Sequence, residues 1–367
     1  MPKRPAAQRC VPSRKFESVH QVAGIRTGRL DYPSAGGGPG CRVALVNTGS
    51  PLRFTVALDR GGDIVEAFFN QHSLAYLSPN GYKPPSHAYQ AGMEFLASWP
   101  AGLMSCCGPQ FIGAPRVEDG VQTSQHGHHS NTPASLRAIV NPDPAAGRNQ
   151  MSLAMTIADT RMFGPVVEVE REIHCTVGVP EIRIADTVVN RSDVPVPHNW
   201  LYHCNFGYPL LDKGTLLVFA GKCTGAWDSV AAAPPGPADA EAFKLVPDPL
   251  PEHTATNERG MILDPRAVGG MCHVGLVNRK LGLGVELEYP RACLPRLAVW
   301  QHYGPSGSYV CGIEPFTGSL VGKAKDTHRL AGQTLSPGET RRYRLTIRAI
   351  ADARGLARLR RCDGPVI

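Results

Sequence analysis

Arg342-Tyr343-Arg344-Leu345-Thr346-Ile347-Arg348-Ala349 alternates polar and apolar side chains almost without a break. Successive side chains of a β-strand project to opposite faces, so this pattern indicates a strand with one face in a core and the other toward water. Partial versions of the pattern occur at 167–173 and 182–184. Half-buried strands of this kind are typical of antiparallel sheets, because the crossover helices of parallel sheets cover both faces.

Strand-like stretches recur along most of the chain. Glycine (39 residues) and proline (33 residues) are both abundant, which suits short strands joined by tight turns. Helical periodicity is confined to two short segments, around 239–245 and 352–361. We therefore predict an all-β fold, a large antiparallel β-sandwich with little helix. Further strands are predicted at 42–47, 53–58, 64–69, 151–158, 186–190, 215–219, 271–277, 282–289, 297–302 and 308–313.

The 367 residues are interpreted as one domain with two flanking segments. Residues 1–39 are predicted to be a partly irregular N-terminal extension, residues 40–350 a single β-sandwich, and residues 351–367 a basic C-terminal tail. The alanine- and proline-rich segment 230–252 is expected to be an insertion over one face of the sandwich or a disordered loop, because strands resume on both sides of it. Segment 79–125 is expected to be a long loop region that could wall a cleft.

Composition narrows the partners and the compartment. The formal net charge of +7 is mild for this length, and the basic residues gather toward the two ends without interleaved aromatic residues, so no nucleic-acid partner is expected. No apolar run approaches the roughly 20 residues that span a bilayer, so no membrane partner is expected either. The 11 cysteines form no C-x-x-C pair and the N-terminus has no apolar leader, which indicates a reducing compartment. We expect a cytoplasmic protein whose oligomeric state the sequence leaves open.

Three short motifs place proton-handling side chains beside glycine or proline. They are His126-Gly127-His128-His129, His203-Cys204-Asn205 shortly before Gly207, and Gly312-Ile313-Glu314-Pro315. Each is expected where a strand gives way to a turn. Histidine titrates near physiological pH, and burial can raise the pKa of a glutamate to meet it. Two histidines and a glutamate on an all-β framework therefore indicate acid–base chemistry on a polar small molecule.

The histidines also allow other interpretations. His126 and His128 would share one face of an extended segment. Together with His203 and Glu314 they could hold a metal ion, since such a site needs at least three converging ligands. Alternatively, one histidine binds the substrate while the others are exposed or hydrogen-bonded.

Further polar and aromatic residues are candidates for contacts with a ligand. His203 and Asn205 would lie on one face of a strand, which favours a role in lining a cleft. Arg60, in the turn-like Arg60-Gly61-Gly62-Asp63, could reach the ligand or lie on the surface. The tryptophans are potential platforms for stacking on a sugar, or simply core residues. They are Trp99, Trp200, Trp227 and Trp300.

Several short motifs follow one another in a characteristic order. They are Leu58-Asp59-Arg60-Gly61-Gly62-Asp63-Ile64, Leu77-Ser78-Pro79, Gly102-Leu103-Met104, His126-Gly127, Ser130-Asn131-Thr132-Pro133-Ala134, Tyr202-His203-Cys204-Asn205-Phe206-Gly207-Tyr208-Pro209 and Gly312-Ile313-Glu314-Pro315. This order resembles that of the aldose 1-epimerase (galactose mutarotase-like) superfamily, and more closely an uncharacterised branch of it. The resemblance spans roughly residues 40–350 and rests on the joint presence of the motifs.

The resemblance implies a β-sandwich of the mutarotase-like type (a supersandwich) with a cleft for a small-molecule sugar. Glu314 is then the base that takes a proton from the anomeric hydroxyl, and His203 is the acid that protonates the ring oxygen. His126 would bind or polarise that oxygen. Such chemistry needs no metal and no organic cofactor.

His128, Asn205 and Arg60 are the further residues predicted to bind the substrate. The sequence departs from the superfamily in two places. Mutarotases follow the strand histidine with an aromatic pair and an asparagine, whereas Cys204-Asn205-Phe206 follows it here, and His128 stands where close relatives are expected to have arginine. The aspartate that mutarotases use to hold sugar hydroxyls has one candidate, Asp228.

Three functions remain open from the sequence. The first is a sugar-active isomerase of carbohydrate metabolism, an aldose 1-epimerase-type enzyme that interconverts the anomers of an aldose or sugar derivative. The second is a different sugar isomerase or lyase on the same fold, with or without metal assistance. The third is a carbohydrate-binding protein without turnover.

Overall fold

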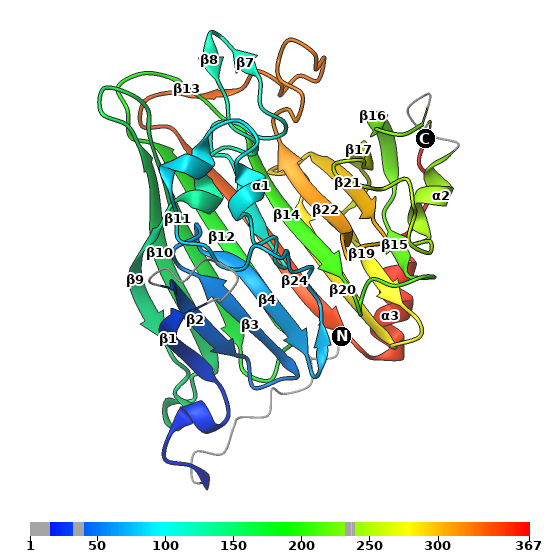
Figure 1. Cartoon of the computed structure of the whole chain (residues 1–367). Helices are drawn as coiled ribbons and strands as arrows, with labels where there is room; N and C mark the ends of the chain where they lie inside the picture. Colours follow the sequence, from blue (N-terminus) through cyan, green and yellow to red (C-terminus); the bar gives the residue numbers. More distant parts are fainter. Residues whose placement is uncertain (1–14, 32–39, 232–235, 237–238) are drawn as a thin grey trace.

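The computed structural model describes residues 15–31, 40–231, 236 and 239–367. Strands dominate it, and its α-helices are short: α1 (Phe95–Ser98), α2 (Ala240–Lys244) and α3 (Ala353–Arg360) (Figure 1). The named strands that pair with one another are all antiparallel within these residues. The predicted all-β, antiparallel sandwich with little helix is therefore confirmed.

A nine-stranded sheet forms one layer of the sandwich. The strand that contains the alternating stretch 342–349 lies in its middle and buries Tyr343, Leu345 and Ile347 while Arg344 stays exposed. The sequence pattern and the burial pattern agree because one face of this sheet packs on the core and the other meets solvent. In spatial order the strands are β15 (Leu216–Val218), β19 (Met271–Asn278), β20 (Leu283–Pro290), β24 (Thr340–Ile350), β12 (Glu181–Asn190), β11 (Val166–Thr176), β10 (Gln150–Thr160) and β9 (Ala134–Val140), with β18 (Ala267–Val268) beside β19.

Two further sheets lie side by side as the other layer, linked where Ile64 and Met104 form an antiparallel bridge (Figure 1). The five-stranded sheet contains β1 (Gly24–Leu30), β2 (Cys41–Asn47), β3 (Leu52–Ala57), β4 (Asp63–Phe69) and β5 (His72–Ser73). The six-stranded sheet runs in the order β16 (Gly221–Asp228), β17 (Arg259–Pro265), β21 (Arg296–Tyr303), β22 (Tyr309–Thr317), β14 (Trp200–Gly207) and β6 (Ser105–Cys107). Apolar residues of all three sheets meet in one large core.

The six-stranded sheet is covered on both faces. Alternate residues of β14, among them Trp200, Tyr202 and Phe206, belong to the large core. Leu201 packs instead in a smaller cluster on the opposite face, which we call the outer face. Every residue of β14 is nonetheless buried, because segments before and after β6 lie over the outer face (Figure 1).

The predicted helices at 239–245 and 352–361 correspond to α2 and α3, and most predicted strand bounds agree within a few residues. One prediction is wrong: Glu314 does not follow the end of its strand, because β22 continues to Thr317. A proline usually ends a central strand because it has no N–H for the ladder. Pro315 is accommodated here where the ladder between β22 and β14 is interrupted, and it pairs in register with Leu297 on β21.

Both segments predicted to flank the domain contribute structure. β1 lies in the predicted N-terminal extension and pairs with β2, while α3 lies in the predicted C-terminal tail and packs against β19 and β20. The division at residues 40 and 350 stays a prediction. Part of the segment 230–252 lies outside the described residues, and the rest of it contains α2.

A buried ion pair fastens the two layers together. The Arg171 guanidinium on β11 donates to both carboxylate oxygens of Asp186 on β12, through Nε and Nη2, each at 2.8 Å. Its Nη1 donates to the carbonyls of Gly61 and Gly62 in the turn between β3 and β4, each at 3.1 Å. The Tyr202 hydroxyl of β14 donates to Asp186 at 2.7 Å. The Arg171–Asp186 pair therefore connects parts of all three sheets, and it is fully buried from solvent.

Asp186→Asn should destabilise the fold by about 3 kcal/mol, because it leaves the Arg171 charge buried without its main partner. Chemical unfolding followed by circular dichroism measures the change. The control is Asp143→Asn, which breaks the half-exposed pair of Asp143 with Arg148 and should cost less than about 1 kcal/mol. Equal losses in the two variants would contradict the role assigned to the buried pair.

Candidate functional site

The outer face of the six-stranded sheet carries a row of alternating large and small residues. In register across five strands lie Trp227, Gly260, Trp300, Gly312 and Asn205. A Cβ atom at Gly260 would overlap the Trp227 indole, and one at Gly312 would lie 3.1 Å from Cε3 of Trp300. Both indoles therefore lie across the glycine beside them, and both remain partly exposed. The result is an aromatic platform along the sheet.

His203 and Glu314 lie next to this row on the same face. His203 Nε2 is 3.3 Å from Glu314 Oε1, across the interrupted ladder between β14 and β22. The backbone of Gly312 is essential to this contact, because a Cβ there would overlap Glu314 Oε1. The two side chains are nearly covered, with 4% of His203 and 3% of Glu314 exposed.

His126 reaches the same place from the loop above the sheet. Its backbone has the left-handed φ of 57°, and Gly127 follows with φ 71° against the carbonyls of Gly108 and Phe111. The Gly113 N–H donates to His126 Nδ1 at 3.4 Å, which leaves the ring proton on Nε2. The His126 and His203 rings meet edge to face, with centroids 5.4 Å apart. The structure therefore brings His126, His203 and Glu314 together.

An aromatic shell surrounds the three residues. The Trp99 ring lies 4.9 Å from that of His203, and the Phe95 ring lies 5.3 Å from that of His126. The indole N–H of Trp99 donates to the Ser105 hydroxyl on β6 at 3.0 Å, which fixes the ring against the sheet. Phe95 and Trp99 both come from segment 79–125, so this segment covers the outer face beside the site. Of the tryptophans, Trp200 is the one that lies wholly in the core.

Glu258 is a further acidic residue of the site, and the sequence reasoning missed it. Its Oε1 accepts from the indole N–H of Trp227 at 3.1 Å, and its Oε2 accepts from that of Trp300 at 2.6 Å. The residue precedes β17 with no motif around it, so only the pairing of β16, β17 and β21 reveals its position. One carboxylate thus holds the two rings of the platform together.

Burial controls the protonation of the site. Burial raises the pKa of Glu314 well above its ordinary value, and the negative charge of Glu258 raises it further. Burial also lowers the pKa of His203 well below its ordinary value, with His126 as a second cause, and lowers the pKa of His126 to about 4. Both shifts favour the uncharged forms, a protonated Glu314 and a neutral His203, so the pair together holds one exchangeable proton.

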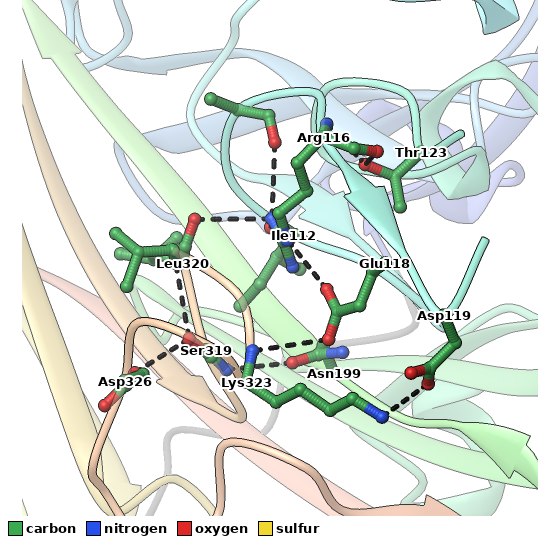
Figure 2. A network of polar contacts seen from close by, with 12 residues as sticks. Ile112, Arg116, Glu118, Asp119, Thr123, Asn199, Ser319, Leu320, Lys323 and Asp326 are labelled. Atoms are coloured by element: carbon green, nitrogen blue, oxygen red, sulfur yellow. Dashed lines mark hydrogen bonds and ion pairs between the residues drawn. The ribbon is translucent and has the colours of Figure 1, made fainter. Parts of the chain in front are cut away.

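The loop that carries His126 is fastened to the loop after β22. Figure 2 shows Arg116 donating through Nη1 to the carbonyls of Ile112, at 3.0 Å, and Leu320, at 3.5 Å. Lys323 adds an ion pair with Asp119 and a backbone hydrogen bond to Glu118 in the same view. The outer end of the covering segment, around β7 (Val117–Glu118) and β8 (Val121–Gln122), is thereby held over the sheet.

The other residues predicted to bind the substrate have partners within the protein. Asn205 lies in the tryptophan row, but its amide N–H donates to the carbonyls of Gly102 and His203. Arg60 is fully buried, and its guanidinium donates to Asn131 at 2.9 Å and Ser98 at 3.4 Å. It therefore ties the cover to the turn between β3 and β4 and does not touch the His203–Glu314 pair.

His128 and Asp228 also have their own partners. His128 Nδ1 lies 3.5 Å from a carboxylate oxygen of Asp159 at the end of β10. Asp228 accepts from the backbone N–H groups of Val230 and Ala231, as a turn residue does. These side chains contact neither His203 nor Glu314.

The described residues contain one group with the spacing of a metal site, and it lies elsewhere. It consists of His273, Glu286 and Glu288 on the nine-stranded sheet. Arg348 and Arg358 already donate to both oxygens of Glu286. His126, His128 and Glu314, the ligands expected for the metal-assisted alternative, do not form such a group.

Within the described part of the chain, no helix has the length and apolar character needed to cross a membrane. Residues 38–349 match the family described as a domain of unknown function, DUF4432. No curated protein is significantly similar to the chain.

Several solved structures share the fold. A proposed aldose 1-epimerase from Klebsiella pneumoniae has a TM-score of 0.78 and 20% identity, over 92% of this chain and 86% of that one. A galactose mutarotase-like protein from Clostridium acetobutylicum has a TM-score of 0.62 and 13% identity, over 90% of this chain and 99% of that one. A proposed aldose 1-epimerase from Escherichia coli has a TM-score of 0.56 and 14% identity, over 89% and 99%. The mutarotase-like fold implied by the resemblance is therefore confirmed.

Gly312→Ala should displace the Glu314 carboxyl from His203, because the added methyl group occupies the space of Oε1. Overpacking of this kind typically costs about 1–3 kcal/mol. Thermal unfolding measures the cost, and the ¹⁵N shifts of the His203 ring measure the lost contact. Gly28→Ala is the control, since nothing lies within 4 Å of a Cβ at that strand position. Unchanged His203 ring shifts in Gly312→Ala would contradict the proposed packing.

Proposed function

This chain belongs to the DUF4432 family, and on that premise we propose that it is a sugar-active isomerase that interconverts the anomers of an aldose or sugar derivative. The observation that carries the proposal is the contact of 3.3 Å between His203 Nε2 and Glu314 Oε1. It supplies an acid and a base beside an aromatic platform, on the fold of proteins described as aldose 1-epimerase or mutarotase-like.

Before the sugar binds, the proton of the pair lies on Glu314, because burial favours the neutral carboxyl and the neutral imidazole. In the proposed reaction the sugar binds against the pair, and this proton moves to His203, which leaves Glu314 as a carboxylate. Glu314 takes the proton of the anomeric hydroxyl while His203 gives its proton to the ring oxygen. The bond between the anomeric carbon and the ring oxygen breaks, and the open chain carries an aldehyde. Rotation about the adjacent carbon–carbon bond presents the other face of the aldehyde, and the reverse proton transfers close the ring. The sugar changes configuration and the enzyme returns to its initial state.

The surroundings of the pair suit a sugar. The partly exposed indoles of Trp227 and Trp300 offer a surface on which the C–H face of a sugar ring can stack. Glu258 holds both indoles, and its oxygens have further lone pairs for sugar hydroxyls. The Nε2–H of His126 is a donor for the ring oxygen. In this proposal, Glu258 takes the role for which the sequence offered Asp228.

Glu314→Gln and His203→Asn should each slow anomer interconversion about 10²–10⁴-fold, because each removes one proton-transfer group. Exchange NMR across a panel of free aldoses first identifies a sugar that the wild type turns over, and then measures the variants. Glu252→Gln and His174→Asn are the controls, since Glu252 is exposed and His174 is partly exposed on the nine-stranded sheet. Full activity in either site variant would remove the role assigned to that residue. Saturable sugar binding without turnover in the wild type would favour the carbohydrate-binding alternative.

The pH dependence should reflect the opposite pKa shifts of the pair. The pKa of His203 is lowered, so the reaction should persist below pH 6.5, the ordinary histidine value. The pKa of Glu314 is raised, so the proton of the pair should be lost only well above 4.5, the ordinary value of a glutamate. The rate should fall when a second proton binds in acid and when the shared proton leaves in alkali. An acid limb centred at or above 6.5 would contradict this assignment.

A further inference from the structure

Four arginines line a hollow that lies away from the site of His203 and Glu314. It has a volume of about 700 Å³ and lies between the loop after β22, the start of β24 and the turns around β18 and β20. Its charged lining consists of Arg291, Arg329, Arg341 and Arg342, with one carboxylate, Asp264. Four arginines against one aspartate leave a formal charge of +3 when the histidine of the lining is neutral. We call this hollow the arginine pocket.

The positive charge of the arginine pocket is largely uncompensated. Arg341 pairs with Glu339 at 2.6 Å, but Arg291, Arg329 and Arg342 have no carboxylate within ion-pair distance in the described part of the chain. The carboxylate of Asp264 is directed at His328, at 3.8 Å, and not at an arginine. Three guanidinium groups of the lining are therefore not neutralised by a carboxylate.

The wall that carries Arg329 is held in place by a buried carboxylate. Asp326 accepts from Arg296 Nη1 at 2.6 Å, from the Ser319 hydroxyl at 2.7 Å and from the His328 N–H at 3.0 Å. Figure 2 shows Ser319 between Asp326 and Asn199, where the Ser319 N–H donates to Asn199. Arg296 and Asp326 are both nearly covered. The loop around 328–330 is therefore fixed before any ligand arrives, which lowers the entropic cost of binding.

We propose that the arginine pocket binds a small organic phosphate. Guanidinium groups match the oxygens of a phosphate in a bidentate manner, and several of them can share a dianion. The volume exceeds that of a bare phosphate ion, and the rest of the lining includes apolar groups from Ala292, Pro295, Leu330 and Tyr343. These groups would contact the organic part of the ligand. None of the lining residues belongs to the site of His203 and Glu314, so this inference does not depend on the proposed function.

Isothermal titration calorimetry of the full chain, at constant ionic strength, tests the proposal with inorganic phosphate and with phenyl phosphate. The pocket variant combines Arg291→Ala, Arg329→Ala and Arg342→Ala, three exposed residues whose loss should leave the fold intact. The control combines Arg354→Ala, Arg360→Ala and Arg361→Ala, which removes the same formal charge from the exposed side of α3. Melting temperatures verify that both variants are folded.

The wild type should bind phenyl phosphate saturably and at least about tenfold more tightly than inorganic phosphate, because the apolar lining adds contacts. The pocket variant should lose at least tenfold in affinity, and the control should keep the affinity of the wild type. Equal losses in the two variants would show a general charge effect and overturn the proposal. Failure of phenyl phosphate to saturate, or binding no tighter than that of inorganic phosphate, would overturn it as well.

Discussion

The buried charge of Arg171 is the constraint on which the rest of the structure depends. A guanidinium in a core is stable only if every side of it meets an acceptor, and here those acceptors come from β12 and from the turn after β3. Asp63, the first residue of β4 after this turn, accepts from the Cys106 N–H on β6 and from the Ser130 hydroxyl. The network thus runs from the nine-stranded sheet to the segment that carries His126. The position of the segment that carries His126 therefore depends on ion pairs and hydrogen bonds in the core.

Most of the fold could be predicted from the sequence because alternation is a local property. The stretch 342–349 alternates since one face of β24 meets solvent, and the short α2 and α3 were visible for a similar reason. β14 is different, because a cover outside the sheet buries its second face. Glu314 was placed beyond its strand because Pro315 is tolerated through a gap in the ladder to β14, and no local pattern records such a gap.

The candidate site, too, could be predicted from the sequence only in part. His126, His203 and Glu314 were recognised by motif, and the structure brings them together although they are far apart along the chain. The roles of the other site residues depend on contacts between distant parts of the chain, which a short motif does not encode. Arg60 is buried and donates to Asn131, and His128 lies beside Asp159. Glu258 can be recognised only from the register of β16, β17 and β21, which brings two indole N–H groups to its carboxylate.

The row of tryptophans and glycines on the outer face also bears on how the protein can evolve. The Trp227 ring occupies the volume that a side chain at position 260 would need, so these two positions cannot change independently. A larger residue at 260 becomes tolerable only after the ring at 227 has been lost. If the residue at 260 is enlarged first, it clashes with the ring and the sheet packs poorly. Change at this end of the platform is therefore expected to proceed by paired replacements.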